Sequence, residues 1–225
     1  MKKIAIIVAG GTGKRFGTET PKQFLPICGK PMIIHTLEAF QKALPDIEFV
    51  VVINPALQNI LDDIFFEFPF SNCIMAESGP ERFYSVRNGL AKITDEDSLV
   101  AIHDAVRPLV SSTVITQGFR DAEYFGNAIP VVNIPDSLRI KDGPLNQPVD
   151  RQVFFRVQTP QCFRTELIKK AYRQNYDEKF TDDAMVLESD GQRIHLIDGN
   201  AENIKITYPF DLLVAEAFLK NQKNE

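Results

Sequence analysis

The fold is decided near the N-terminus, where residues 4–22 read IAIIVAGGTGKRFGTETPK. Residues Ile4–Ala9 are apolar and rich in β-branched side chains, which is typical of a strand buried on both faces. Gly10, Gly11 and Gly13 follow, and their lack of Cβ atoms lets a large anion approach the backbone N–H groups. The stretch predicts a strand that leads into an anion-binding loop. For the glycines alone, a tight turn without a ligand is an equal alternative.

Two basic residues favour the binding loop over the empty turn. Arg15 and Lys22 follow the first glycines, and charged hydrogen bonds contribute roughly 1.5–3 kcal/mol each. The loop is not of the kinase type, because Val8 stands where a glycine is needed six positions before Lys14. It is not a dinucleotide fingerprint either, because Phe16 replaces the last glycine of that motif. We therefore expect a polyphosphate ligand of another class.

Length and composition predict one well-packed domain that spans residues 1–225, of which 44% are hydrophobic. The net charge of -5 argues against nucleic acid as a partner. The cysteines at positions 28, 73 and 162 form no C-x-x-C pair, so we expect reduced thiols and a cytoplasmic protein. We expect no contact with a membrane, because no apolar stretch of the sequence is long enough to span one.

Strand-like and helix-like segments alternate along the chain. We expect strands at 4–9, 49–53, 73–76, 99–102, 128–132, 194–197 and 204–207, and helices from 31, at 56–68, 81–93, 114–124, 163–174 and 181–188, and from 209. This alternation predicts an α/β fold, in which a Rossmann-like, mostly parallel sheet carries helices on both faces. Ligands of such sheets gather at the carboxyl ends of the strands.

The alternation is interrupted at residues 134–152, which contain little apolar surface. Asp142-Gly143 lies between Leu138-Arg139-Ile140 and Val149, a pattern that predicts a β-hairpin. Such a segment cannot bury itself against its own domain. We expect a projecting arm that packs on a second copy of the chain, with an ordinary internal loop as the alternative.

The sequence HDAVRP, residues 103–108, places a carboxylate and a guanidinium directly after a predicted buried strand. Asp104 has two interpretations, a helix cap or a metal ligand, and the nearby polyphosphate loop favours the metal. Arg107 fits either a structural ion pair or a phosphate contact. We expect His103 to position Asp104.

Six ordered blocks of sequence together carry a resemblance to a known family. The chain resembles the sugar-phosphate cytidylyltransferases, and among them most closely the methylerythritol phosphate cytidylyltransferases, over nearly its whole length. The blocks are AGGTGKRFG with PKQFLP, SGPERFYSVRNGL at 78–90, HDAVRP, VDRQVFFRVQTPQCF at 149–163, FTDDAMVLE at 180–188 and ENIKITYPFDL at 202–212. Each block alone is a weak signal.

The resemblance implies an enzyme whose partners are CTP and a sugar-alcohol phosphate and whose cofactor is Mg²⁺. A phosphate oxygen of the acceptor, 2-C-methyl-D-erythritol 4-phosphate, attacks the α-phosphorus of CTP, and pyrophosphate leaves. This reaction belongs to non-mevalonate isoprenoid precursor synthesis. Catalysis then consists of positioning two anions and neutralising charge on the transferring group.

The resemblance also implies roles for individual residues. The catalytic set is Arg15, Lys22 and Lys205. The nucleotide set is Ala9, Gly10, Gly11, Gly13, Gly79, Ser85, Asp104 and Ala105, with Asp104 also at the metal. The acceptor set is Arg107, Ser137, Arg151 and Thr159. Of these, Arg151 belongs to the arm and is expected to reach the active site of the other subunit of a homodimer.

Two alternatives to this activity remain open at this point. A ribitol 5-phosphate cytidylyltransferase shares the AGG loop, PKQFLP, HDAVRP and QTPQ, although the aspartate directly before Arg151 favours methylerythritol phosphate. A noncatalytic nucleotide-binding regulator would keep the fold, but it has no need to retain Arg15, Lys22, Asp104, Arg107 and Lys205 together.

Overall fold

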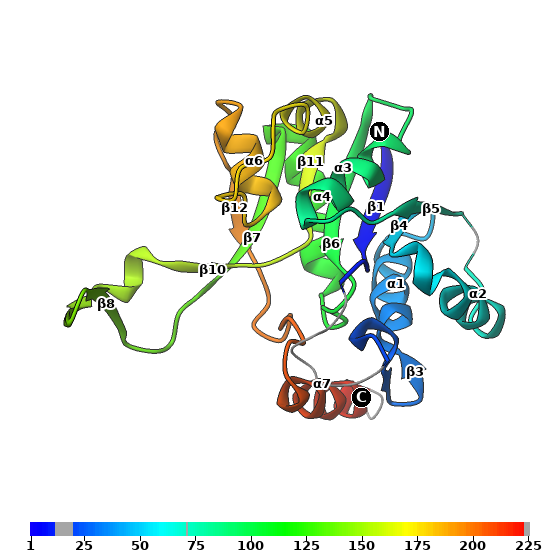
Figure 1. Ribbon diagram of the computed structural model, residues 1–225, viewed down its shortest axis with the longest axis horizontal. Coiled ribbons are helices and arrows are strands. Elements are labelled where there is room, and N and C mark those ends of the chain that lie inside the picture. The colour runs from blue at the N-terminus through cyan, green and yellow to red at the C-terminus, as the bar shows by residue number, and fades with distance from the viewer. Residues whose placement is uncertain (12–19, 71, 223–225) are drawn as a thin grey trace.

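The computed structural model describes residues 1–11, 20–70 and 72–222. In these residues, the central sheet has eight strands in the order β10-β7-β11-β6-β1-β4-β5, with β12 also paired to β7 (Figure 1). The strands are β1 (Lys2–Val8), β4 (Glu48–Ile53), β5 (Cys73–Glu77), β6 (Ser98–Asp104), β7 (Asn127–Asn133), β10 (Phe155–Val157), β11 (Gln161–Arg164) and β12 (Leu196–Asp198).

The direction of the strands explains where ligands can gather. Strand β1 pairs in parallel with β4 on one side and with β6 on the other, and β4 pairs in parallel with β5. The chain therefore runs outward from β1 through β4 to β5 and then returns to the other side of β1. Such a reversal of strand order opens a crevice at the carboxyl ends of β1 and β6.

Helices cover both faces of this sheet, as the sequence predicted. The helices are α1 (Met32–Ala43), α2 (Gln58–Glu67), α3 (Arg82–Ala91), α4 (Ser112–Phe125), α5 (Thr165–Ala171), α6 (Asp183–Ser189) and α7 (Pro209–Gln222). One apolar core joins α1, α2 and α4 to one face, and a second joins α3, α5 and α6 to the other. The α/β, Rossmann-like, mostly parallel fold is confirmed. The single domain spanning 1–225 stays a prediction.

A third, smaller core lies beside the carboxyl ends of the strands. It joins α7 to a short hairpin formed by β2 (Pro26–Ile27) and β3 (Lys30–Pro31). Ile27, Ile206 and Ala215 are fully buried in this core. This packing fixes the C-terminal segment next to the sheet edge.

Three predicted elements need correction. The helix predicted at 163–174 begins at Thr165, because Phe163 belongs to β11, which pairs antiparallel with β6. The strand predicted at 204–207 is wrong: the segment is irregular, with Ile206 N–H donating to the carbonyl of Val106 and Ile204 N–H to that of Glu202. The last strand begins at Leu196, two residues later than predicted.

The arm at 134–152 contains the predicted hairpin. Strands β8 (Leu138–Asp142) and β9 (Leu145–Val149) pair antiparallel around the turn Gly143-Pro144, where Gly143 adopts a positive φ of 56°. Figure 1 shows the hairpin projecting from the body of the molecule. Its apolar side chains Ile140 and Leu145 are 50% and 71% exposed.

Among the helices of the described residues, none combines the length and apolar character that crossing a membrane requires.

Candidate active site

Two loops at the carboxyl ends of β1 and β6 form the floor of the site. The N–H of Ala9 donates to the carbonyl of Val52 at 2.8 Å, and the N–H of Ala105 donates to the carbonyl of Val8 at 3.1 Å. These backbone bonds extend the parallel pairing by one residue beyond the strands. Both loops therefore begin at fixed positions on either side of the crevice.

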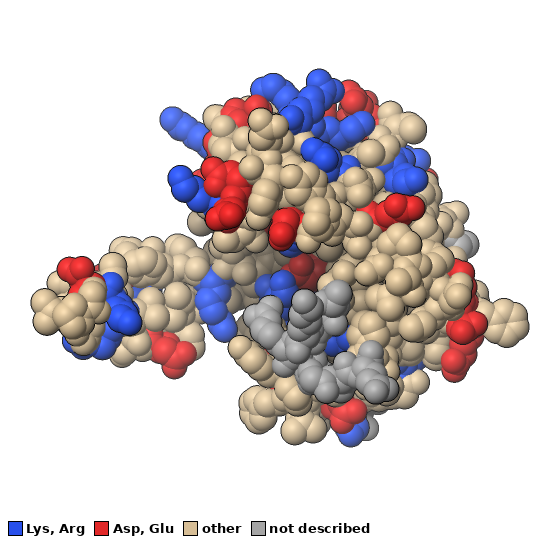
Figure 2. Space-filling model, in the orientation of Figure 1, with Lys and Arg blue, Asp and Glu red and all other residues tan. Residues whose placement is uncertain are grey.

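A cavity of about 480 Å³ lies above this floor. Figure 2 shows a hollow on this side of the molecule, in which basic and acidic side chains meet. The cavity is lined by Val8, Ala9, Gly10, Gly11, Lys22, Gln23, Asn54, Ser78, Gly79, Pro80, Glu81, Arg82, Ser85, Asp104, Val106, Lys205 and Thr207.

Two of the predicted glycines are required by close packing. A Cβ on Gly10 would collide with the Cβ of Ser78, and a Cβ on Gly79 would collide with the Cβ of Tyr84. The N–H of Gly79 donates to Ser85 Oγ at 3.0 Å, and this hydroxyl donates to the carbonyl of Glu81 at 3.2 Å. The loop after β5 therefore lies against both the β1 loop and the start of α3.

Gln23 holds the glycine loop from below, a role that the sequence did not reveal. Its side chain is 2% exposed, and its Nε2 donates to the carbonyls of Ala9 at 2.7 Å and Gly11 at 3.2 Å. The amide thus fixes the backbone on both sides of Gly10. The motif PKQFLP contains this residue, but no spacing rule marks a buried glutamine as a loop support.

Lys22 lines the cavity and also contacts the C-terminal segment. Its Nζ donates to the carbonyl of Ile206 at 2.9 Å. This contact joins the turn after the glycine loop to the segment that carries Lys205. Two of the predicted site residues, Gly13 and Arg15, lie outside the described residues.

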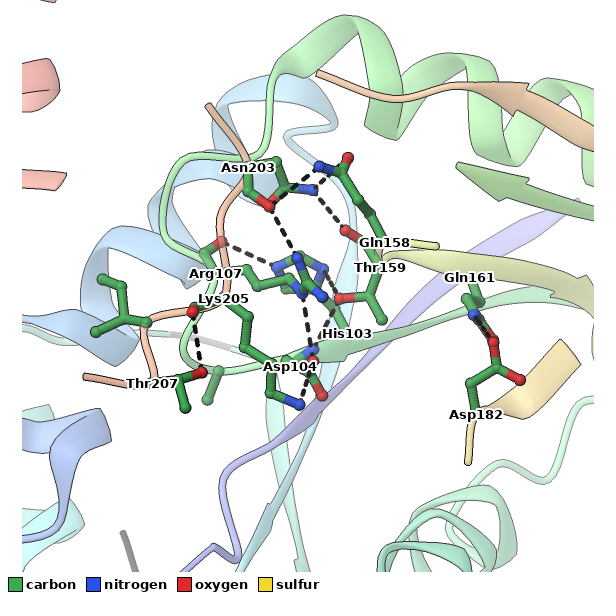
Figure 3. Close-up of polar contacts among 12 residues, drawn as sticks. His103, Asp104, Arg107, Gln158, Thr159, Gln161, Asp182, Asn203, Lys205 and Thr207 are labelled. Carbon is green, nitrogen blue, oxygen red and sulfur yellow. Dashed lines mark hydrogen bonds and ion pairs between the residues drawn. The ribbon is translucent and has the colours of Figure 1, made fainter. Parts of the chain in front are cut away.

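Asp104 is the electrostatic centre of the site, because three cations surround its carboxylate. Lys205 Nζ lies 3.0 Å and Arg107 Nε 3.3 Å from Oδ2, and Arg82 Nε lies 3.7 Å from Oδ1. Figure 3 shows Lys205 and Arg107 converging on the carboxylate. Burial alone would raise the pKa of Asp104, but the three cations outweigh it and hold the pKa well below its usual range. The residue is ionised at all physiological pH values.

Arg107 is held in place by the C-terminal segment. Its Nη1 donates to the carbonyl of Asn203 at 2.8 Å, and Asn203 Nδ2 donates to the carbonyl of Thr159 at 2.7 Å (Figure 3). Burial lowers the pKa of Arg107, and the charge of Asp104 opposes this shift. The guanidinium is therefore a fixed charge that borders the site.

His103 supports the site through Thr159, and its ring nitrogens contact groups other than the Asp104 carboxylate. Its Nε2 lies 3.1 Å from the carbonyl of Arg107, and its Nδ1 lies 3.0 Å from Thr159 Oγ1. A carbonyl only accepts, so Nε2 carries the proton and Nδ1 accepts from the threonine hydroxyl. Thr159 Oγ1 in turn accepts the N–H of Asp104 at 3.2 Å. His103 therefore contacts Asp104 only indirectly, through the hydroxyl of Thr159.

A second cavity of about 220 Å³ adjoins the first. Its polar lining comes from Arg82, Asp104, Arg107, Gln158, Thr159, Gln161, Thr181, Asp182 and Lys205. Arg82, Asp104 and Lys205 line both cavities. Two ligands could therefore meet at these three side chains.

The predicted site residues that lie in the described part of the chain fall into two groups. Most of them line one of the two cavities. Ala105 does not, because it is fully buried and its carbonyl accepts from Thr36 Oγ1 at 2.9 Å. Ser137 and Arg151 lie on the exposed arm, where Arg151 donates to the carbonyl of Pro135, and neither lines a cavity in one chain.

Arg82 is a charged residue of the site that the sequence analysis missed. It lies at the first position of α3, lines both cavities and contacts Asp104. The block SGPERFYSVRNGL contains it, but an arginine at the start of an amphipathic helix is more often a solvated residue. Its partner Asp183 lies 101 residues later, beyond the reach of any local pattern.

The family model described as 2-C-methyl-D-erythritol 4-phosphate cytidylyltransferase matches residues 3–221. The chain belongs to this family. It is therefore a CTP-dependent cytidylyltransferase of isoprenoid precursor synthesis, with 2-C-methyl-D-erythritol 4-phosphate as the acceptor. The match favours this acceptor over ribitol 5-phosphate and favours an enzyme over a noncatalytic regulator.

Individual relatives of this cytidylyltransferase family agree in sequence and in structure. A 2-C-methyl-D-erythritol 4-phosphate cytidylyltransferase from Bacteroides thetaiotaomicron is 44% identical over 220 residues, covering 97% of this chain and 100% of the relative. The crystal structure of the enzyme of the same name from Thermus thermophilus is 30% identical, with a TM-score of 0.78 over 98% of this chain and 100% of the other. A crystal structure of 4-diphosphocytidyl-2C-methyl-D-erythritol synthase gives a TM-score of 0.81 at 29% identity, over 97% and 98% of the two chains.

Proposed function

We propose that the transfer takes place at the shared wall of the two cavities, with CTP in the larger and the acceptor phosphate in the smaller. The observation that carries this proposal is that Arg82, Asp104 and Lys205 line both cavities. A direct transfer between two anions requires such a wall, because the attacking oxygen must approach the α-phosphorus opposite the leaving pyrophosphate. The cations on the wall oppose the repulsion between the two substrates.

The larger cavity suits the nucleotide. The backbone of Ala9, Gly10 and Gly11 lines this cavity and would contact the phosphates, and Gly79 and Ser85 form a small polar wall where the cytosine base would bind. Lys22 and Lys205 stabilise the negative charge that develops on the transferring phosphate, with Arg15 as the third cation of the proposed catalytic set.

The smaller cavity suits the acceptor. Arg107 and Lys205 supply positive charge for its phosphate, while Thr159, Thr181 and Asp182 supply groups that could bind hydroxyls. A phosphate oxygen of the acceptor forms the new bond to the α-phosphorus, and the bond from that phosphorus to the bridging oxygen of pyrophosphate breaks. The chain itself forms no covalent bond in this scheme.

The residues present fit a magnesium ion that arrives with the nucleotide. In the described part of the chain, His, Cys, Asp and Glu form no group of three or more that could hold a metal by themselves. Mg²⁺ is commonly held by one or two carboxylates together with substrate phosphates, and Asp104 offers such a carboxylate. Bound there, Mg²⁺ would neutralise phosphate charge.

We also propose a homodimer built through the arm. The apolar arm residues Ile140 and Leu145 are 50% and 71% exposed, and Val153 and Phe154, directly after the arm, are 69% and 44% exposed. Exposed apolar surface on a projecting segment is typical of a protein interface. Ser137 and Arg151 lie on this arm, away from the cavities of their own chain, so in the dimer they would contribute to the acceptor site of the partner.

A pyrophosphate-release assay tests the proposed reaction. With Mg²⁺, release should require both CTP and 2-C-methyl-D-erythritol 4-phosphate, and UTP, ATP or ribitol 5-phosphate should support it poorly. Lys22→Ala should lower kcat far more than the affinity for CTP, because the contact strengthens as charge develops. Lys170→Ala, which changes a surface lysine paired with Asp190, serves as the control. Equal losses of kcat and affinity would make Lys22 a binding residue only.

Subunit mixing tests the arm. Neither Arg151→Ala nor Lys22→Ala dimers should be active, but their mixture should recover part of the activity, because some mixed dimers would contain one complete site. A monomeric protein at assay concentrations, or a mixture without recovery, would contradict the shared site.

A further inference from the structure

Arg82 is anchored by a bidentate ion pair with a carboxylate outside the two cavities. Its Nη1 and Nη2 donate to Oδ1 and Oδ2 of Asp183 at 2.8 and 2.7 Å. Asp183 is fully buried at the start of α6, and its Oδ1 also accepts the hydroxyl of Tyr172 at 2.6 Å. These contacts join α3 to α6 and to Tyr172, which ends α5.

The anchored guanidinium and the other two cations contact different oxygens of Asp104. Arg82 Nε lies 3.7 Å from Oδ1, whereas Lys205 and Arg107 contact Oδ2. The carboxylate is thus attracted from two directions, and the charge of Arg82 beside Oδ1 opposes its rotation about the Cβ–Cγ bond. The orientation of Asp104 therefore depends on α3 as well as on the C-terminal segment.

Lys205 and Arg82 differ in their freedom to move. The Lys205 side chain is 42% exposed, and it pairs with Asp104. It can therefore turn toward a phosphate, because the buried Asp104 carboxylate would keep Arg107 and Arg82 as partners. Arg82 cannot, because the Asp183 carboxylate is 0% exposed and would remain buried without its bidentate partner.

We propose that Arg82 is a positioning residue, which keeps Asp104 oriented between the two cavities when Lys205 turns toward the substrate phosphates. This inference rests on the proposed function and extends it to a residue that the sequence motifs left without a role. Arg82 acts through Asp104, and its own charge is already matched by Asp183. Its contribution is therefore to the geometry of the carboxylate, with little direct attraction for phosphate.

Substitution of Arg82 tests this role. Arg82→Gln should lower kcat by about 10–100-fold, as loss of a group that orients a functional carboxylate does, while the KM for CTP stays nearly unchanged. Arg82→Lys should not restore kcat, because an ammonium cannot make the bidentate contact with Asp183. A large rise in KM with kcat preserved would instead identify Arg82 as a substrate-binding cation and overturn the inference.

A matched variant separates positioning from stability. Val186→Ala removes buried apolar packing from α6 but leaves all ion pairs in place. It should lower the melting temperature while kcat is retained at a temperature where circular dichroism shows a folded protein. If Val186→Ala lowers kcat as strongly as Arg82→Gln, the effect comes from loosening α6 and the inference fails.

A double-mutant cycle with Asp104→Asn decides whether Arg82 acts through Asp104. If it does, Arg82→Gln should have little further effect on kcat in the Asp104→Asn background. Independent effects would instead multiply to within about twofold, which would overturn the inference. If Asp104→Asn alone leaves kcat unchanged, the proposed function fails at Asp104. Thus the failure of the proposed function can be told apart from the failure of the inference.

Discussion

Protonation of His103 should destabilise the protein on mild acidification. The imidazole is fully buried, with Nε2 at the carbonyl of Arg107 and Nδ1 at the hydroxyl of Thr159. Protonating Nδ1 would remove the acceptor of that hydroxyl and place a charge in the core. Burial accordingly lowers the pKa of His103 from its ordinary value of 6.5 to about 4.

The sign and size of the effect follow from proton linkage. Between pH 6.5 and about 4 the unfolded chain binds a proton at this position and the folded chain does not. Stability therefore rises with pH across this window and falls on acidification. The free energy of unfolding should be about 2 kcal/mol lower at pH 5 than at pH 7 from this residue alone, and the loss should level off near about 3 kcal/mol below pH 4.

Urea unfolding of the wild type and of His103→Gln, measured at half-unit steps from pH 7 to pH 5 in metal-free buffer, provides the test. The variant should be less stable at pH 7, because it loses the acceptor for the Thr159 hydroxyl. Its free energy of unfolding should change less with pH than that of the wild type, so the two curves converge on acidification. Parallel curves would refute the assignment of a buried, neutral imidazole.

Three further predictions concern packing outside the cavities. Gly89→Ala should destabilise the protein by about 1 kcal/mol in thermal unfolding, because the new Cβ would lie 3.0 Å from methyl groups of Ile6 and Val52. This crowding should outweigh the higher helix propensity of alanine. A rise in stability would contradict this packing. Gly126→Ala should cost about 1–2 kcal/mol, because this residue ends α4 with a φ of +89°; an unchanged melting temperature would count against it. The Cys162 thiol is fully buried, and burial raises its pKa. A thiol reagent should therefore label it only at the rate of unfolding. Rapid labelling of the native protein would disprove this.

The regular part of the fold was predictable because its signals are local. Ile4–Ala9 and Phe49–Ile53 are continuous apolar runs, and each becomes a buried strand of the parallel sheet. Strand β11 was not predictable in this way. Phe163 lies two residues before the start of helix α5, and its strand conformation depends on pairing with β6, about 60 residues earlier in the sequence.

The candidate site was predictable to the extent that its residues lie in short motifs after strands. Asp104 is one example, because it ends a buried strand next to Arg107. Gln23 and Arg82 were missed because their partners are distant or belong to the backbone: Gln23 holds the carbonyls of Ala9 and Gly11, and Arg82 pairs with Asp183. No pattern of residue types along the chain indicates such contacts before the elements are packed.

The arrangement around Asp104 explains how like charges can be held together before any substrate binds. The sheet supplies the carboxylate, whereas the cations come from separate segments: Arg82 from α3, Lys205 from the C-terminal segment and Arg107 from the turn after β6. Without Asp104, the three cations would repel one another. With it, the cations are held close together at the wall shared by the two cavities, where the proposed transfer takes place. A carboxylate at this position therefore stabilises the cluster of cations before the proposed transfer begins.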